Sequence, residues 1–337
     1  MNDALPSLLF PFKRGMIDTP RSGQRLLILG AAAGFRLPPE FSAELQLVQG
    51  FRPDFLALTK AGFPVTPLPE GDGYDGAFVL LGRHRRENSQ RLSAALQCVR
   101  PGGLVIAAGM KKDGAQSVAK RMAHLLPLEE QLAKHHGVVF WLRRPAQLDE
   151  DVLAELSLPP LATTEGYATA AGSFSEGAVD PGSYLLAESL PGDISGAVAD
   201  YAAGWGYLSL RLAERFSLAT LDLYEAHHAS LEAARQNLAV HAPGASCRFF
   251  WHDLLAETIS HRYDAIVMNP PFHRSRAAEP DMGSAMVAAA AKALKPGGQL
   301  FLVANRGLPY EKVMEVAFAR CGELVRSAGY KVLWAER

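Results

Sequence analysis

Short apolar runs alternate with stretches of helical spacing along the whole chain. In the first half, residues 25–30, 78–81 and 104–107 are such runs, and residues 88–98 have the spacing of an amphipathic helix. Runs of this length that end in small or polar residues are typical of buried strands in a parallel sheet. The pattern therefore predicts an α/β fold, with helices on both faces of mostly parallel sheets.

The two halves of the chain repeat one plan. Residues 74–79, a helix and then Pro-Gly-Gly at 101–103 recur as residues 263–268, a helix and Pro-Gly-Gly at 296–298. A looser match sets residues 32–35 opposite residues 202–205. We interpret this repeat as a duplication; the alternative is two unrelated α/β domains that share apolar strands and Pro-Gly-Gly turns.

The two copies differ where chemistry is expected. The looser match sets Asp200 opposite Gly30 and Gly206 opposite Arg36, and the main repeat sets residues 269–272 opposite residues 80–83. We therefore expect the first copy to have lost its site. Turn and breaker residues at 158–166 indicate a linker, so the predicted domains are residues 1–158 and 166–337.

Composition adds limits rather than a function. The 337 residues include 34 basic and 35 acidic side chains, so any nucleic-acid surface must be a local patch. The 3 cysteines are far apart and form no CxxC pair, so neither a disulfide framework nor a structural zinc site is indicated, and a reducing cytoplasm fits best. No apolar run is long enough to cross a membrane.

The second half contains the parts of a nucleotide site. A strand that ends at Asp200 is followed by a turn with Ala202, Gly204 and Gly206 and then by a helix. Small residues in such a turn let the backbone approach a ligand near the helix N-terminus.

Two further strands end in acidic residues. Glu225 ends the next strand and can accept hydrogen bonds from the ribose hydroxyls of a nucleotide; Asp222 is a rival inside the same strand. Asp253 ends a third strand and can accept from an adenine amine, although a turn or helix cap would also explain an aspartate there.

The most specific signal is the tetrapeptide Asn269, Pro270, Pro271 and Phe272, which follows a fourth strand. The prolines stop the strand and turn the Asn side chain and the carbonyls toward the crevice at the strand ends. The Asn269 amide oxygen and the Pro270 carbonyl can accept both N–H groups of a planar amine, while Phe272 stacks on its ring. These four residues are the predicted catalytic set, and the chemistry needs no metal.

Histidine pairs and basic segments give weaker signals. His135–His136 and His227–His228 have no third ligand spaced nearby, so solvated helix faces explain them better than a metal. Residues 83–86 and 111–112 are basic and could supply RNA phosphate contacts, but a solvated turn explains them equally well.

These motifs resemble a known family. Residues 166–337 resemble class I S-adenosylmethionine-dependent methyltransferases, and specifically the ribosomal RNA guanine-N2 methyltransferases of the RsmC and RlmG type. The residues that carry this resemblance are 179–183, the Asp200 turn, 269–273 and 303–310. The family also has a degenerate methyltransferase domain ahead of the active one, so the resemblance extends over nearly the whole chain.

The resemblance implies two tandem Rossmann-like domains with seven-stranded sheets, the first degenerate and serving substrate binding or stability. It implies methyl transfer from S-adenosylmethionine to the 2-amino group of a guanine in ribosomal RNA, with the 16S rRNA of the small subunit as the expected substrate. The residues expected at the cofactor are Asp200, Ala202, Gly204, Gly206, Glu225, Asp253 and Asn269. A cytoplasmic monomer is expected.

One departure bears on the cofactor. Family members have glycine at the position of Ala202, and a left-handed backbone there would cost alanine on the order of 1 kcal/mol. Methylation of an adenine amine or of a protein glutamine remains an alternative within the same chemistry. A noncatalytic RNA-binding or ribosome-assembly protein with a decayed cofactor site is the alternative from another class.

Overall fold

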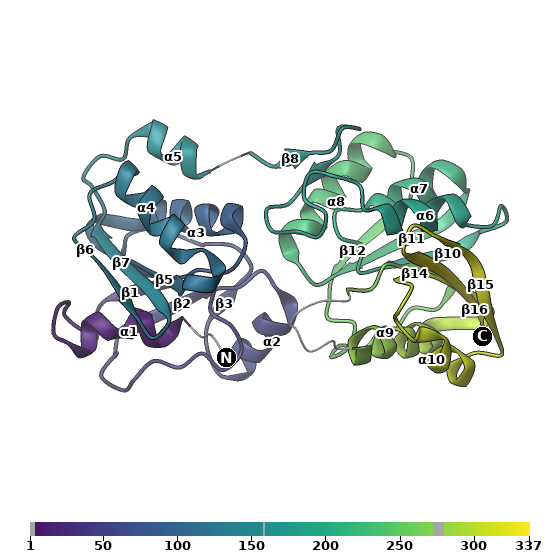
Figure 1. The fold of residues 1–337 in the computed structure, drawn as a ribbon, viewed down its shortest axis with the longest axis horizontal. Helices are drawn as coiled ribbons and strands as arrows, with labels where there is room; N and C mark the ends of the chain where they lie inside the picture. Colours follow the sequence, from purple (N-terminus) through teal and green to yellow (C-terminus); the bar gives the residue numbers. More distant parts are fainter. Residues whose placement is uncertain (1–3, 158, 272–279) are drawn as a thin grey trace. The chain divides into compact units, whose positions relative to one another are not determined.

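The computed structural model describes residues 4–157, 159–271 and 280–337. The chain forms two compact units, Met1–Pro159 and Pro160–Arg337. Each unit has a seven-stranded sheet flanked by helices (Figure 1). The predicted fold class is confirmed, because both sheets are parallel except at one edge and have helices on both faces.

The sheet of the N-terminal unit has the strand order β3-β2-β1-β4-β5-β7-β6. Its strands are β1 (Arg25–Leu29), β2 (Glu44–Val48), β3 (Val65–Thr66), β4 (Tyr74–Leu80), β5 (Val99–Met110), β6 (Glu130–Lys134) and β7 (Gly137–Arg143). Its helices are α1 (Leu5–Lys13), α2 (Arg52–Lys60), α3 (Arg85–Cys98), the short η1 (Lys111–Asp113), α4 (Ala115–Leu125) and α5 (Glu150–Leu156).

The sheet of the C-terminal unit has the equivalent order β12-β11-β10-β13-β14-β16-β15. Its strands are β10 (Gly196–Tyr201), β11 (Leu218–Glu225), β12 (Cys247–Trp251), β13 (Tyr263–Met268), β14 (Leu294–Asn305), β15 (Arg320–Ser327) and β16 (Tyr330–Glu336). Its helices are α6 (Pro181–Ser189), α7 (Tyr207–Arg215), α8 (His228–His241), α9 (Pro280–Ala293) and α10 (Tyr310–Ala317). The strands β8 (Leu161–Ala162) and β9 (Ala168–Thr169) form a separate ribbon.

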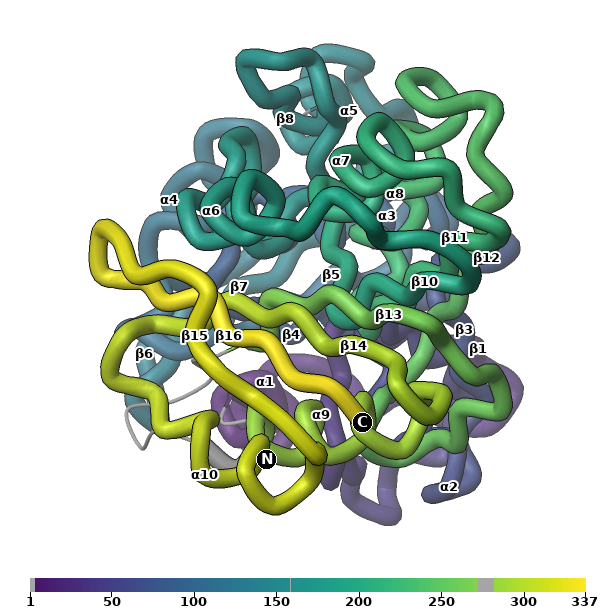
Figure 2. Tube along the Cα trace, turned by 90° about the vertical axis from the view of Figure 1, so that its right-hand side faces the viewer, coloured from purple at the N-terminus to yellow at the C-terminus, as the bar shows by residue number. Residues whose placement is uncertain are grey.

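The core of the C-terminal unit consists of two layers, one on each face of the sheet. Val198 and Val267 pack with α6, α7 and α8, whereas their neighbours Ala199 and Met268 pack with α9 and α10. Figure 2 shows these two sets of helices above and below the successive strands β10, β13 and β14. Apolar residues occupy consecutive positions because both faces of a parallel sheet are buried.

One aspartate in each unit explains why the repeated segments persist. In the C-terminal unit, the Asp264 carboxylate accepts from the Ala197 N–H at 2.7 Å and from Lys295 Nζ at 2.7 Å. In the N-terminal unit, Asp75 accepts from the Arg25 N–H at 2.9 Å, and its other oxygen accepts from Arg100 Nε at 2.9 Å. Both aspartates therefore connect three neighbouring strands through the same contacts.

The repeated Pro-Gly-Gly turn is structural for a separate reason. Its first glycine has a left-handed backbone in both units, with φ of 75° at Gly102 and 74° at Gly297. Its second glycine has no room for a side chain, since a Cβ would lie 2.8 Å from the Asp75 carbonyl at Gly103 and 2.9 Å from the Tyr263 carbonyl at Gly298. The turn therefore needs its glycines in both units, whatever each unit binds.

The strand pairing corrects the looser part of the internal alignment. Leu29 pairs with Val79 on β4, and Tyr201 pairs with Met268 at the equivalent place on β13. Asp200 therefore corresponds to Ile28, and the expected match to Gly30 was wrong by two positions. The looser match failed here because residues 30–43 form no helix, whereas α7 directly follows the equivalent turn.

The corrected alignment places Ala202 opposite Gly30, and both have left-handed backbones. The φ angle is 57° at Ala202 and 78° at Gly30. Only glycine adopts this conformation without steric cost. The departure noted in the sequence therefore falls on a position where alanine is strained.

We expect Ala202→Gly to raise the free energy of unfolding of the C-terminal unit by up to about 1 kcal/mol, because it relieves the left-handed alanine. Urea unfolding measures this change. Ala203→Gly is the control, because Ala203 is buried and its φ is negative, so this variant should lose stability. Equal losses in both variants would contradict the strain at Ala202.

Candidate functional site

The candidate site lies where the strand order reverses. β10 and β13 are neighbours in the middle of the sheet, and the chain winds outward from them in opposite directions. In sheets of this kind, ligands bind in the crevice beyond the carboxyl ends of the strands at this switch point. Asp200 lies at the end of β10, and Asn269 directly follows β13.

Asp200 is fully buried and only half satisfied. Its Oδ2 accepts a hydrogen bond from Ser209 Oγ on α7 at 2.7 Å, whereas no described residue donates to its Oδ1. Burial raises the pKa of Asp200 to about 7, against the opposing hydrogen bonds from Ser209. A buried carboxylate oxygen without a donor is costly unless a ligand supplies one.

The turn after β10 is tied to the end of β11. The Gly204 N–H donates to Glu225 Oε2 at 2.8 Å, and Glu225 Oε1 accepts from the His227 N–H at 2.7 Å. A Cβ at Gly204 would meet no atom within 4 Å, so space is open beside this glycine. At Gly206 a Cβ would lie 3.0 Å from the Ala234 Cβ, so this glycine lets α7 approach α8. Glu225 is therefore held at the strand end beside open space.

Asp222 is engaged within the sheet. It is fully buried, and Arg248 on β12 donates to both of its oxygens at 2.7 and 2.6 Å. The Tyr263 hydroxyl donates a further hydrogen bond at 2.6 Å. This ion pair satisfies the buried charge, so Asp222 has a structural role and leaves Glu225 as the acid at the end of β11.

Asp253 lies beyond β12 and organises its own turn. Its Oδ1 accepts from the Leu255 N–H at 2.9 Å, and its own N–H donates to Glu257 Oε2 at 2.9 Å. This is the turn-forming role that an aspartate at this position also allows. Among the described residues, no donor reaches the other carboxylate oxygen, so it can still accept from a ligand.

The orientation of the Asn269 amide is fixed by two residues that the sequence had not assigned to the site. Asn269 Nδ2 donates to Asp180 Oδ2 at 2.9 Å and to Ser183 Oγ at 2.8 Å. Both partners lie at the start of α6, where Asp180 also caps the helix by accepting from the Ser183 N–H at 2.7 Å. Both amide hydrogens are thereby used, and Oδ1 is left as the acceptor of the site.

The rest of the tetrapeptide lies partly within the described structure. Pro270 is buried and Pro271 is exposed, as expected of a segment that leaves the sheet. Phe272, the predicted stacking residue, lies outside the described residues. In the sequence, residues 179–183 served only as a mark of the family resemblance. Asp180 followed by Pro181 predicts the start of a helix. It does not predict the contact of Asp180 with Asn269, which lies 89 residues further along the chain.

The N-terminal unit has the equivalent strands and turn, but it lacks the side chains that correspond to Glu225 and Asn269. Gln49 occupies the place of Glu225 and accepts from the Phe51 N–H at 2.8 Å, but its amide nitrogen donates to the Ala31 carbonyl. Leu80, the last residue of β4, occupies the place of Asn269. The Arg91 guanidinium donates to the Leu80 carbonyl at 2.9 Å and lies 2.7 Å from where a Cβ on Gly30 would be. This unit is therefore degenerate, and Arg91 lies against the turn at Gly30.

The described ranges contain neither a cluster of metal ligands nor a membrane-spanning helix. No group of 3 or more His, Cys, Asp or Glu side chains among residues 4–157, 159–271 and 280–337 is arranged to hold a metal ion. Within the same part of the chain, no helix has the length and apolar character needed to cross a membrane.

Comparison with known proteins gives consistent matches. The methyltransferase small domain model matches residues 166–334. A ribosomal RNA small subunit methyltransferase C from Pseudomonas aeruginosa is 31% identical over 258 residues, which cover 75% of this chain and 76% of that protein. The protein of the same name from Shewanella pealeana is 29% identical over 270 residues, covering 79% of this chain and 78% of its own.

A solved structure extends the likeness to both units. It is the T. thermophilus 16S rRNA N2 G1207 methyltransferase in complex with AdoMet and guanosine, which is 29% identical with a TM-score of 0.76. The match covers 95% of this chain and 89% of that one. With the family model over residues 166–334 and the site at the switch point, the chain belongs to the methyltransferase small domain family.

Proposed function

We propose that this chain transfers a methyl group from S-adenosylmethionine to the exocyclic 2-amino group of a guanine in the RNA of the small ribosomal subunit. The observation that carries the proposal is the fixed amide of Asn269, whose Oδ1 is left to accept from a planar amine. The named relatives that match most of this chain are small-subunit ribosomal RNA methyltransferases, which supports guanine as the target.

The residues at the strand ends fit S-adenosylmethionine. The unsatisfied Oδ1 of Asp200 suits the cofactor's ammonium group, and the open space beside Gly204 leaves room along the turn. Glu225 would accept from the ribose hydroxyls and Asp253 from the adenine amine. Ala202 and Gly206 would shape the turn. When bound, the cofactor supplies an electrophilic methyl group on a sulfonium.

Asn269 and Pro270 would orient the target amine. The Asn269 Oδ1 and the Pro270 carbonyl accept the two N–H groups, so the nitrogen lone pair is directed away from both acceptors. Accepting these hydrogen bonds also stabilises the positive charge that develops on the nitrogen during methyl transfer. Pro271 lies beyond the end of β13 and prevents the strand from continuing, and Phe272 is proposed to stack on the base. Catalysis then depends on position and charge, with no metal required.

The function is tested by incubating the protein and S-adenosylmethionine with unmodified 16S rRNA, with small ribosomal subunits, with DNA and with a glutamine-containing release factor. We expect N2-methylguanosine in 16S rRNA or in the subunits, measured by mass spectrometry. Asn269→Ala should lower the rate roughly 100-fold or more, because the orienting acceptor is lost.

Each alternative predicts a different product in this assay. Methyladenine as the product would show that an adenine amine is the target, and methylglutamine would show that a protein is. The absence of product with every substrate would support a noncatalytic RNA-binding protein. The far-UV circular dichroism spectrum of Asn269→Ala is the control for folding, and calorimetry shows whether its cofactor affinity stays near the parental value. Parental turnover by this variant would contradict the role of Asn269.

We expect Ser183→Ala to act through Asn269 rather than through the cofactor. Loss of one hydrogen bond frees the amide to turn, so kcat should fall roughly tenfold, with little change in KM or cofactor affinity. Ser189→Ala is a matched control on the same helix, since the Ser189 hydroxyl donates only to the Leu185 carbonyl. If Ser183→Ala lowered kcat no more than Ser189→Ala did, Ser183 would not position Asn269.

Cofactor affinity should increase with pH because of Asp200. Its pKa of about 7 means that the carboxyl is mostly protonated at pH 6 and mostly ionised at pH 8. An ammonium ion binds the ionised form better, so binding releases a proton and the Kd falls as pH rises through about 7, by up to tenfold per unit. Calorimetry between about pH 6 and pH 7.5 measures this dependence.

Asp200→Asn is the control for this dependence. The variant should bind the cofactor more weakly, and its Kd should not vary with pH in the same window. The same titrations should give one cofactor per chain, because Gln49 and Arg91 remove the equivalent acceptors from the N-terminal unit. A parental pH profile in Asp200→Asn, or two sites per chain, would contradict these assignments.

A further inference from the structure

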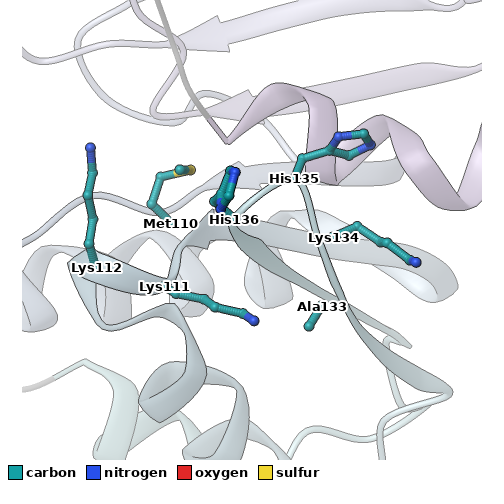
Figure 3. A pocket seen from close by; sticks show the side chains of 7 residues that line it. All are labelled: Met110, Lys111, Lys112, Ala133, Lys134, His135 and His136. Atoms are coloured by element: carbon teal, nitrogen blue, oxygen red, sulfur yellow. The ribbon is translucent and has the colours of Figure 1, made fainter.

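A basic hollow lies at the edge of the N-terminal unit where β5 ends. Its volume is about 660 Å³, and Figure 3 shows Lys111 and Lys112 on one side and Lys134 on the other. All three lysines are exposed. The residues that line this basic hollow are Met110, Lys111, Lys112, Ala133, Lys134, His135 and His136.

The lining of the basic hollow is suited to an anion. It contains three lysines and two histidines, and none of its lining residues in the described structure is acidic. This local surplus contrasts with the net charge of −1 for the whole chain. A recessed patch of one sign attracts a chain of phosphates without drawing the rest of the surface to it.

Helix α1 holds one wall of the basic hollow in place. The Lys134 ammonium lies 5.5 Å from the centroid of the Phe10 ring, and the His135 ring packs edge-on against Phe10 at 5.9 Å. The Ser7 hydroxyl donates to the Lys134 carbonyl at 2.8 Å. These contacts order the β6–β7 hairpin before any ligand binds, which lowers the entropy cost of binding.

The two residues of the hairpin turn are histidines with left-handed backbones, a conformation that is unfavourable for most residues with a side chain. His135 and His136 both have left-handed backbones, with φ of 51° and 59°. A two-residue turn of this kind is usually Asn-Gly, because few other side chains tolerate a positive φ at both positions. Histidines at both positions therefore make this turn less stable than Asn-Gly would.

The duplication provides an internal comparison. The Lys111 N–H donates to the His136 carbonyl at 3.0 Å, and in the other unit the Arg306 N–H donates to the Gly329 carbonyl at 2.8 Å. His135 and His136 therefore correspond to Ala328 and Gly329, which meet the same left-handed requirement without ring side chains. The fold thus accepts small residues in this turn, so the fold itself does not require imidazoles.

We propose that the basic hollow binds the phosphodiester backbone of the substrate RNA, with the lysines contacting phosphates and the imidazoles donating to phosphate or ribose oxygens. This inference rests on the proposed function, because the same chain then acts on an RNA. A lipid surface suits this patch poorly, since Met110 is the only large apolar side chain among the described residues that line it. Such contacts position RNA without reading its sequence.

The basic segment at residues 83–86 is a weaker candidate for the same role. The Arg86 guanidinium donates to the Pro159 carbonyl within its own unit, and Arg83 and Arg85 line a smaller cavity of about 160 Å³ that also contains Asp113. Arg86 is therefore engaged in structure, and an acid accompanies the other two arginines. The basic hollow is the better site for a phosphate chain.

The test neutralises the three lysines together, as Lys111→Gln, Lys112→Gln and Lys134→Gln. Binding to an unmodified 16S rRNA fragment is measured by fluorescence anisotropy over a range of salt concentrations. Three lost phosphate contacts should weaken binding on the order of tenfold or more at low salt and reduce the slope of log K against log salt by about 2 to 3. Cofactor affinity should not change.

A matched control removes the same charge elsewhere in the unit. Lys13→Gln, Lys60→Gln and Lys120→Gln together neutralise three exposed lysines on α1, α2 and α4. This variant should keep the parental RNA affinity to within about twofold. If both triple variants lose RNA affinity equally, or if neither loses it, the basic hollow is not the site that binds the RNA backbone. Tighter binding of the parental protein to phosphatidylglycerol vesicles than to RNA would also overturn the proposal.

The histidines allow a test in which stability and binding move in opposite directions. His135→Asn with His136→Gly gives the turn its preferred residues, so the thermal midpoint should rise while RNA affinity falls severalfold. Unchanged RNA affinity in this more stable variant would exclude the imidazoles from the site. RNA binding needs no methyl transfer, so failure of the methylation assay and failure of the basic hollow are separate results.

Discussion

A single carboxylate in each unit sets the register on which the rest of the structure depends. Asp264 connects the start of β10 to Lys295, just before the Pro-Gly-Gly turn near the start of β14, and Asp75 makes the same connection between β1 and β5. Each contact is partly exposed and is worth only about 1 kcal/mol. Their importance is geometric, because a shift of one residue would move every strand-end side chain to the opposite face.

With this register fixed, the chemistry follows from where the strands end. Asp200, Glu225 and Asn269 come from three adjacent parallel strands whose carboxyl ends meet at one edge. Burial then gives each polar group a different character. Asp222 is neutralised by Arg248, whereas Asp200 keeps an unsatisfied oxygen and a raised pKa. Only the second kind of group is available to a ligand.

Local patterns in the sequence predicted most of this arrangement. The strands, the turn and the acids at the strand ends have short-range signatures, so the sheets and the region of Asp200, Glu225 and Asn269 could be predicted. The role of Asp180 and Ser183 could not, because their contact with Asn269 spans 89 and 86 residues and depends on how α6 packs beside β14. The match of Asp200 to Gly30 failed because the first unit lacks a counterpart of α7.

The comparison of the two copies separates what the fold requires from what a function adds. Asp75 and Asp264, with the glycines of both Pro-Gly-Gly turns, are retained because the sheet needs them in either unit. Asn269 and Glu225 occur only in the C-terminal copy. Leu80 and Gln49 occupy the equivalent places in the N-terminal copy. By the same reasoning, His135 and His136 belong with the functional residues, since Ala328 and Gly329 form the equivalent turn without rings. A copy that has lost its acceptors but keeps strained imidazoles beside three lysines has been specialised for a different contact, and a phosphate chain is the ligand that this chemistry fits.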